Sequence, residues 1–304
     1  MRIAVIGAGG VGGYFGGRLA QAGQNVTFIA RGATLEALRA HGLRVDSILG
    51  DFVIDRVQTT PTGTFDAILM AVKAWQIPAA AAQLAPLMHD DTMVVPLENG
   101  IDAPEVLAEI VGPRHVVGGL CAIVSYSVAP GHIRHAAAEP MVMFGELDHG
   151  RSERVERLRA AFEQANVHAE VPPDIRRSMW TKFLFIATMS GVGALTRVPI
   201  GVWRVIPEVR AMTDASLREV VALAKARGVD LGHDAVSVTW QRYDGMPPAS
   251  TSSMQRDIME GKPSELDAQL GAIVRLAREH DVPAPVTSFI YHALLPQERV
   301  ARGS

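Results

Sequence analysis

The C-terminal half of the sequence contains one charged side chain in an otherwise apolar stretch. Lys182 is the only charged residue between Arg177 and Arg197, and aromatic and aliphatic residues flank it on both sides. Removing an amine from water lowers its pKa toward neutrality, which suits a general acid that gives a proton to a carbonyl oxygen. The alternative is a lysine whose aliphatic stem covers the core while its ammonium stays in water. The sequence leaves both roles open.

Two more polar side chains follow predicted strands. Lys73 comes after the apolar run 65–72, and Asn99 comes shortly after the run 92–97. Ligands of open α/β sheets bind beyond the carboxyl ends of the strands, so both positions are suited to line a ligand site. A solvated loop residue is the alternative for each of them.

A serine and a glutamate lie at predicted helix starts. Ser252 and Gln255 have the spacing of a capping box, which places Ser253 in the first helical turn, where it could also face a ligand. Ser264 is expected to cap the next helix, and the helix dipole favours a carboxylate such as Glu265 in its first turn. A structural role is therefore sufficient for both Ser253 and Glu265.

The elements that must position these residues begin with a glycine-rich motif at the N-terminus. The apolar run 2–6 predicts a buried strand, the pattern over 11–22 predicts a helix, and 25–30 predicts a second strand. A turn of the form G-x-G-x-x-G joins the first strand to the helix, and this order within roughly thirty residues is typical of dinucleotide binding. The candidate cofactor-binding residues of the turn are Gly7, Ala8, Gly9, Gly10, Val11 and Gly12.

Each glycine of the motif has a physical reason. Gly7 permits the tight turn, Gly9 lets the backbone approach a pyrophosphate, and Gly12 lets the helix pack close to the strand. The helix N-terminus adds free N–H groups and a partial positive charge, which attract phosphate.

The end of the second predicted strand distinguishes between the two nicotinamide dinucleotides. NAD sites carry a carboxylate at that position, whereas this sequence has Arg31 and no Asp or Glu before Glu36. A guanidinium pairs with a 2′-phosphate in forked geometry, and a carboxylate would repel that phosphate. NADP(H) is therefore the predicted cofactor, and a solvated arginine at a strand end is the alternative.

The remaining pattern predicts two domains. Parallel αβ units and β-rich runs around Pro130-Gly131 fill the first half, and the sequence after Pro172 is helical almost to its end. We predict an α/β fold: an N-terminal Rossmann-type doubly wound sheet with added antiparallel edge strands, plus an all-α C-terminal domain. The predicted domains are residues 1–171, which bind NADP, and residues 172–304, which bind substrate and carry the catalytic group.

The composition of the 304-residue chain is that of an ordinary globular protein, with 48% hydrophobic and 20% charged residues. A net charge of −3 without a basic block indicates neither a nucleic-acid nor a membrane partner. No apolar run reaches the roughly eighteen residues of a membrane span, and the N-terminus begins a strand rather than a signal peptide. The single cysteine, Cys121, lies in an apolar run, so we expect a reducing, cytoplasmic environment. No metal site is predicted.

Taken jointly, these residues resemble the ketopantoate reductase (2-dehydropantoate 2-reductase) family along nearly the full length of the chain. The matching residues are the Gly7–Gly12 motif, Arg31, Val72-Lys73-Ala-Trp-Gln76, Asn99-Gly100, Pro130-Gly-His132, Trp180-Thr-Lys182, Ser252-Ser-Met-x-x-Asp257 and Glu265. The resemblance implies that Lys182 is the proton-donating lysine and that Lys73 and Asn99 lie near nicotinamide and substrate. It further implies that Ser253 binds substrate, that Glu265 binds cofactor, and that the pathway is pantothenate biosynthesis.

The sequence departs from this family where substrate would bind. Reductases of the family typically carry asparagines one and two turns after the lysine, and here those positions hold Ile186 and Ser190. Two further asparagines of family members align with Ile200 and Leu270. Replacing an amide by an aliphatic group removes hydrogen bonds worth roughly 0.5–1.5 kcal/mol each and makes the pocket more apolar.

The expected function is therefore NADPH-dependent reduction of a 2-keto acid to a 2-hydroxy acid, with Lys182 as the general acid and Ile186 and Ser190 in the substrate-binding set. One alternative is a reductase of the same fold that acts on a bulkier, more apolar keto acid or ketone. The other is an NADP(H)-sensing regulator without turnover, against which Lys182 argues. The expected partner is a small keto acid, and a homodimer is left open.

Overall fold

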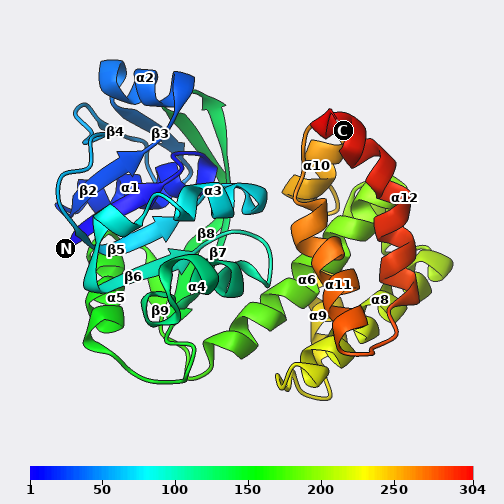
Figure 1. The fold of residues 1–304 in the computed structure, drawn as a ribbon. Helices are drawn as coiled ribbons and strands as arrows, with labels where there is room; N and C mark the ends of the chain where they lie inside the picture. Colours follow the sequence, from blue (N-terminus) through cyan, green and yellow to red (C-terminus); the bar gives the residue numbers. More distant parts are fainter. Residues whose placement is uncertain (304) are drawn as a thin grey trace. The chain divides into compact units, whose positions relative to one another are not determined.

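The computed structural model describes residues 1–303, and the chain divides into two compact units (Figure 1). The first unit comprises Met1–Glu98 and Ala103–Ile175. The second unit begins at Arg176 and also includes the short segment Asn99–Asp102, although both neighbours of that segment in the chain belong to the first unit. The predicted fold class is confirmed, because the first unit contains a parallel sheet and the second is helical.

A four-stranded parallel sheet forms the centre of the first unit, with strand order β2-β1-β5-β6. Its strands are β1 (Arg2–Ile6), β2 (Asn25–Ile29), β5 (Phe65–Met70) and β6 (Met88–Pro96). Ile3 and Val5 of β1 belong to one hydrophobic cluster. Ala4 and Ile6, which point to the opposite face, belong to another. Both faces of the sheet are buried, which is why these strands read as continuous apolar runs.

Helices pack on both faces of this sheet (Figure 1). They are α1 (Gly10–Gln21), α2 (Gly32–His41), α3 (Ile77–Ala81), α4 (Ala103–Val111) and α5 (Glu153–Gln164). Phe15 of α1 and Phe162 of α5 share the cluster of Val5, with ring centroids 6.1 Å apart. Ala80 of α3 and Leu107 of α4 belong to the cluster on the other face.

The antiparallel strands form a sheet of their own instead of extending the parallel sheet. The second sheet contains β3 (Leu43–Ser47), β4 (Phe52–Ile54), β7 (Gly118–Ala129), β8 (His132–Gly145) and β9 (His168–Glu170). Its order is β4-β3-β8-β7, and β9 also pairs with β8. The predicted β7–β8 pair is antiparallel, and it forms part of this second sheet. The long strand β8 has β7 on one side and β3 and β9 on the other. The bridge between Val94 of β6 and Val116, just before β7, connects the two sheets.

The second unit consists of helices. They are α6 (Ile175–Thr196), α7 (Ile200–Trp203), α8 (Pro207–Ala226), α9 (Ala235–Gly245), α10 (Ser253–Met259), a π-helical turn (Asp267–Gly271), α11 (Ala272–Glu279) and α12 (Pro285–Arg302). Two glycines of α6 mark close packing: a Cβ on Gly191 would lie 2.8 Å from Leu270, and one on Gly193 would lie 2.4 Å from Gln255. Within residues 1–303, none of the helices is long and apolar enough to cross a membrane.

A buried carboxylate joins α8 to the start of α12. Glu219 of α8 accepts hydrogen bonds from the backbone N–H groups of Val286 (2.7 Å) and Thr287 (2.8 Å). It also accepts a bond of 2.6 Å from the Thr287 hydroxyl. These N–H groups belong to the first turn of α12 and have no partner inside the helix, so Glu219 serves as an N-cap supplied by another helix.

Candidate functional site

The glycine-rich turn has the geometry that the motif predicts. Gly7 has a positive φ of 94°, and a Cβ there would lie 2.7 Å from the carbonyl oxygen of Ala71. A Cβ on Gly12 would lie 1.9 Å from the carbonyl oxygen of Gly7, so the first turn of α1 packs directly on the loop. Gly9 differs from both, because a Cβ at this position would meet nothing within 4 Å.

Open space beside Gly9 coincides with the start of α1. Gly9 is the N-cap residue of α1, and no side chain caps the helix. The first N–H groups of a helix have no intrahelical partners, and together with the dipole they attract anions. The turn therefore fits a phosphate or pyrophosphate group.

Sequence reasoning missed one polar residue beside this turn. A Cβ on Gly10 would lie 2.6 Å from the carbonyl oxygen of Ser125, so strand β7 passes next to the start of α1. The Ser125 hydroxyl oxygen is buried and has no hydrogen-bond partner within residues 1–303. No local pattern marks Ser125, because only the long-range packing of β7 brings it to the turn.

Arg31 lies after the end of β2 and is exposed. Its backbone provides the N-cap of α2, and its side chain makes no capping hydrogen bond. Glu36 is also exposed on α2. The guanidinium is thus accessible to an anionic group, and the first carboxylate after it is a full helical turn along the chain.

The two candidates at the strand ends lie in different units. Lys73 follows β5 in the first unit, where its backbone N–H donates to the Gln76 side chain (3.2 Å) and its Nζ lies 5.9 Å from the centroid of the Trp75 ring. It is half-buried. Asn99 is also half-buried and belongs to the second unit with the rest of its segment.

Lys182, Ile186 and Ser190 follow one another at four-residue spacing along α6 and therefore share a face. Lys182 is half-buried, and its ammonium has neither a hydrogen-bond nor an ion-pair partner among the residues that the structure describes. Ile186 is also half-buried. Ser190 is fully buried, and its hydroxyl has no partner within the described chain.

The element that carries Ser253 packs against the same face of α6. Gly193 lies eleven residues after Lys182, which at 3.6 residues per turn is within about 20° of the same direction. Gln255 of α10 contacts α6 at Gly193, as the short Cβ distance shows. Ser252 caps α10 as predicted, its Oγ accepting from the Gln255 N–H at 3.0 Å. The Gln255 side chain donates instead to the Val198 carbonyl (3.0 Å), so the second half of the capping box is absent.

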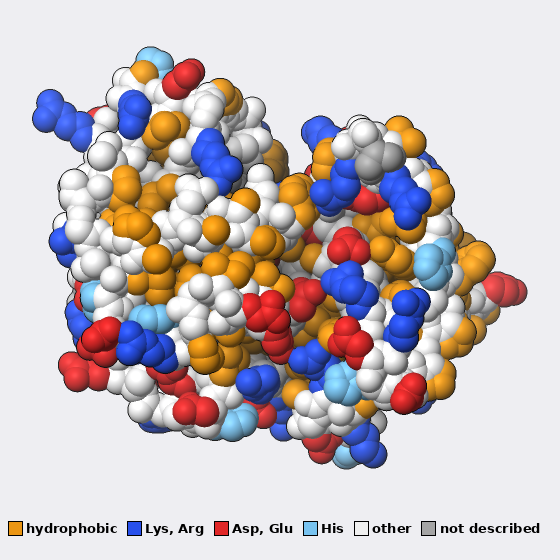
Figure 2. Space-filling model, in the orientation of Figure 1, with side chains coloured by type: hydrophobic (Ala, Val, Ile, Leu, Met, Phe, Trp, Pro, Cys, Tyr) orange, Lys and Arg blue, Asp and Glu red, His pale blue; other side chains and the backbone are white. Residues whose placement is uncertain are grey.

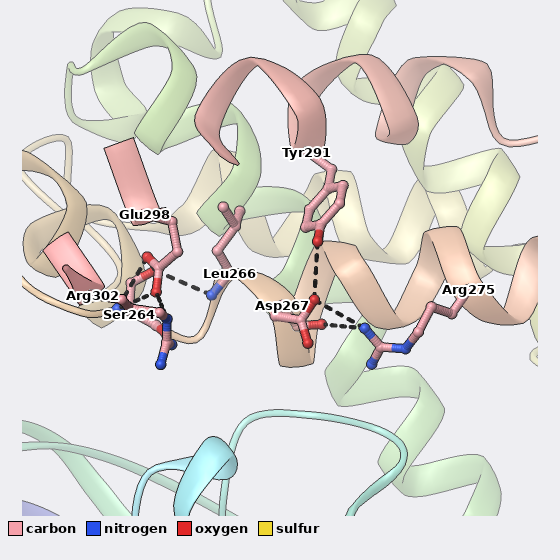
Figure 3. Close-up of polar contacts among 7 residues, drawn as sticks. All are labelled: Ser264, Leu266, Asp267, Arg275, Tyr291, Glu298 and Arg302. Atoms are coloured by element: carbon pink, nitrogen blue, oxygen red, sulfur yellow. Dashed lines mark hydrogen bonds and ion pairs between the residues drawn. The ribbon is translucent and has the colours of Figure 1, made fainter. Parts of the chain in front are cut away.

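Glu265 is buried and directly follows Ser264, which is hydrogen-bonded to the last helix. The backbone N–H of Ser264 donates to both carboxylate oxygens of Glu298 (3.0 and 3.1 Å), and its hydroxyl donates to one of them at 2.5 Å (Figure 3). Arg302 completes this contact, donating to Glu298 at 2.6 Å and to the Ser264 carbonyl at 2.8 Å. The predicted cap Ser264 also accepts from the N–H of Leu266 (3.1 Å).

The π-helical turn after Glu265 contains a second residue that sequence reasoning missed. Gln269 is fully buried, and neither its amide nitrogen nor its amide oxygen has a hydrogen-bond partner within residues 1–303. Single π-turns inside helices are often found at functional sites. Among residues 1–303, no group of three or more His, Cys, Asp or Glu is arranged to hold a metal ion.

A parallel sheet with an open glycine turn, joined to a helical unit, defines a Rossmann-type protein of two parts. The family model described as "Ketopantoate reductase PanE/ApbA" matches residues 3–149, and the model described as "Ketopantoate reductase PanE/ApbA C terminal" matches residues 174–298. The chain therefore belongs to the ketopantoate reductase family, a family of oxidoreductases.

Individual relatives match over almost their whole lengths. The chain is 31% identical over 293 residues to "Uncharacterized oxidoreductase YkpB" of Bacillus subtilis, covering 96% of this chain and 97% of the relative. It is 30% identical over 333 residues to the 2-dehydropantoate 2-reductase of Mesorhizobium japonicum, covering 100% and 99%. The solved structure of a D-mandelate dehydrogenase with NADH and anilino(oxo)acetate has a TM-score of 0.90 at 21% identity, covering 99% of both chains. At this identity the last likeness shows a shared fold.

Proposed function

We propose that this protein catalyses the NADPH-dependent reduction of a 2-keto acid to a 2-hydroxy acid, as a 2-dehydropantoate 2-reductase does. One observation carries the proposal: in a chain that belongs to the ketopantoate reductase family, Lys182 presents an ammonium that has no partner in the described chain. A lysine whose aliphatic stem only covers the core also keeps its ammonium in water without a protein partner, and the Lys182→Met variant described below separates the two roles. An ammonium without such a partner is available to substrate.

The cofactor is assigned to residues that fit its chemistry. The glycine turn, with its open position at Gly9 and its uncapped helix, suits the pyrophosphate. The exposed guanidinium of Arg31 suits a 2′-phosphate. The cofactor-binding set is completed by Lys73, Asn99 and Glu265. When bound, NADPH supplies a hydride to the carbonyl carbon of the substrate.

Lys182 is assigned the proton. As the carbonyl oxygen gains negative charge, the ammonium first donates a hydrogen bond to it and then gives up its proton, so that a hydroxyl group results. Asn99 and Ser253 are assigned to orient the substrate. Ile186, on the same face of α6 as Lys182, is assigned to its lining, and the fully buried Ser190 lies one turn further along that face. In domain terms, we assign residues 1–171 to cofactor and residues 172–304 to substrate and catalysis.

A second candidate substrate class is favoured by Ile186. This side chain is half-buried on the Lys182 face, where it offers a ligand a methyl-rich surface and no hydrogen bond. An alkyl or aryl substituent packed there gains roughly 25 cal/mol per Å² buried. We therefore expect a keto acid with a larger apolar substituent to have a higher kcat/KM than ketopantoate. Ile186→Asn should shift that ratio toward ketopantoate, and efficient ketopantoate reduction by the unaltered protein would contradict the preference.

The proposal extends to the cellular location and the partners of the protein. We place the protein in the cytoplasm, with a keto acid as its partner and neither nucleic acid nor a membrane. A homodimer would be recognised by light scattering on the purified chain.

The proposal is tested by following NADPH oxidation with 2-keto acids of graded size. Lys182→Met should lower kcat by about 10²–10⁴, the range for a general acid, while NADPH binding stays nearly unchanged. Lys225→Met, at an exposed position of α8, is the matched control and should leave kcat unchanged. NADPH binding without turnover on any keto acid would favour the regulator instead. Full activity of the Lys182 variant would remove that residue from the mechanism.

A further inference from the structure

An arginine of α11 joins two acidic residues that come from distant parts of the sequence. Arg275 donates through Nη1 to Oδ1 of Asp267 (3.0 Å) and through Nη2 to Oδ2 of Asp102 (3.0 Å). The Tyr291 hydroxyl of α12 donates to the same Asp267 oxygen at 3.0 Å, and Figure 3 shows this end of the contact. We call Asp102, Arg275, Asp267 and Tyr291 the Arg275 clasp.

Each of the two aspartates of the clasp lies in a short segment that also carries a proposed ligand-binding residue. Asp102 closes the segment Asn99–Asp102, and Asp267 lies two residues after Glu265. The two segments also touch through their backbones, because a Cβ on Gly100 would lie 3.3 Å from the carbonyl oxygen of Ala268. Arg275 thus fastens the Asn99 segment to the π-helical turn at the point where the two come together.

The other end of the Glu265 segment is fixed as well. Glu298 holds the backbone and hydroxyl of Ser264, and Arg302 holds the Ser264 carbonyl. Glu265 therefore lies between two anchors, one residue after Ser264 and two residues before Asp267. The Arg275 clasp also reaches the Asn99 segment, through Asp102.

The clasp contributes little to folding for its number of contacts. Acidic and basic side chains lie side by side over the surface of the helical unit (Figure 2), and the Arg275 side chain is 45% exposed. Exposed ion pairs add little net stability because water and salt screen them. Burial lowers the pKa of Arg275, but the carboxylates of Asp267 and Asp102 outweigh burial and raise it, so the guanidinium stays charged.

We propose that Arg275 is a positioning residue, which sets the distance between Asn99 and Glu265 and so aligns the groups that hold cofactor and substrate. This inference rests on the proposed function for the roles of Asn99 and Glu265, whereas the clasp itself rests on the contacts. Losing the guanidinium releases both segments at once, because neither carboxylate can bind the other.

Arg275→Met tests the proposal against a matched control in the same unit. Arg210 of α8 pairs with Asp244 through two hydrogen bonds of 2.9 Å at similar exposure, 40% and 48%, and contacts neither segment. Arg275→Met should weaken NADPH binding and lower kcat/KM by about tenfold to a hundredfold, the scale of a small misplacement of reacting groups. Arg210→Met should change neither NADPH binding nor kcat/KM, although it should lower the melting temperature at least as much as Arg275→Met does. Arg275→Lys, a point charge that cannot fork between two carboxylates, should lie between the unaltered protein and Arg275→Met.

A second measurement separates this proposal from the proposed function. In the full chain without ligand, hydrogen exchange of the backbone amides over 99–102 and 264–268 should be faster in Arg275→Met and in Asp102→Asn, and unchanged in Arg210→Met. The double variant Asp102→Asn/Arg275→Met should exchange no faster over 99–102 than either single variant. If exchange is faster in Arg275→Met but the unaltered protein reduces no keto acid, the role of Arg275 in holding the two segments stands and the proposed function is refuted. Unchanged exchange, or normal NADPH affinity and kcat/KM in Arg275→Met, would overturn the clasp.

Discussion

Two glycines of the same turn should respond in opposite ways to one added methyl group. In Gly9→Ala the new Cβ meets nothing within 4 Å, and φ is −81°, a value that alanine adopts without strain. Alanine is a poorer N-cap than glycine by roughly 0.5–1 kcal/mol. Loss of glycine from the unfolded chain returns roughly 0.4–1 kcal/mol. The free energy of unfolding should therefore change by less than about 1 kcal/mol.

In the proposed binding mode, the same methyl group occupies the space that the pyrophosphate needs. Preventing one charge-assisted hydrogen bond between phosphate and the start of α1 costs roughly 1.5–3 kcal/mol, which weakens NADPH binding about tenfold to a hundredfold. Gly12→Ala is the contrasting variant, because its Cβ would lie 1.9 Å from the Gly7 carbonyl oxygen. Relieving that overlap requires a backbone shift, which costs roughly 1–3 kcal/mol or more of stability.

Fluorescence titration with NADPH and thermal unfolding of both variants provide the measurements. The expected result is a stable Gly9→Ala protein with weak NADPH binding and a destabilised Gly12→Ala protein. A Gly9→Ala protein that binds NADPH as tightly as the unaltered chain would show that the open position does not face the cofactor.

Three further variants test other parts of the molecule. Arg31→Ala should remove most of the preference for NADPH over NADH, by about tenfold because the side chain is exposed, and equal affinities for both cofactors in the unaltered protein would contradict the assignment. Glu219→Gln should lower the free energy of unfolding in denaturant by roughly 1.5–3 kcal/mol, because the charged acceptor of the α12 cap is lost; a midpoint equal to that of the unaltered protein would argue against that cap. Hydrogen bonds from Arg44 and His132 lower the pKa of Asp46 from 3.8 to about 2, so its stabilising contribution is present above pH 3.8 and is lost as the pH falls through about 2. Asp46→Asn should flatten the stability profile in that window, and an unaltered acid limb would show that the pair is not formed in solution.

The parts of the structure that the sequence predicted correctly are those that local chemistry determines. The strand, turn and helix at the N-terminus could be predicted because Gly7 and Gly12 stand where a Cβ would overlap neighbouring backbone. The cap of α10 by Ser252 is equally local. The reciprocal bond, which the Gln255 side chain would accept from the Ser252 N–H, is absent. The Gln255 side chain instead donates to the carbonyl of Val198, a partner 57 residues away that spacing alone does not indicate.

The second sheet could not be derived in the same way. A strand pattern shows that a segment pairs, but it does not show with which partner. The bond between Ser47 and His135 spans 88 residues and joins β3 to β8. Because β8 is occupied by β3 and β9 on the side away from β7, the hairpin belongs to this sheet and not to the parallel one.

The surroundings of the candidate residues were the least predictable part. The sequence placed Asn99 after a strand, but not among the residues of the helical unit. The ion pair that holds its segment joins Asp102 to Arg275 across 173 residues, and neither residue belongs to a recognisable motif. Glu298, which holds the start of the Glu265 segment, is likewise one of several charged residues in the last helix and stands out only through its burial.

Burial also separates the two positions of α6 at which family members typically carry asparagine. Ser190 is fully buried with an unpartnered hydroxyl, so it offers a ligand no exposed surface in the described chain. Ile186 is half-buried one turn from Lys182, so a group bound at the ammonium is within reach of its side chain. Of these two departures, we therefore expect Ile186 to be the one that contacts substrate directly. Replacement of the buried Ser190 by alanine should therefore alter kcat/KM ratios between keto acids less than Ile186→Asn does.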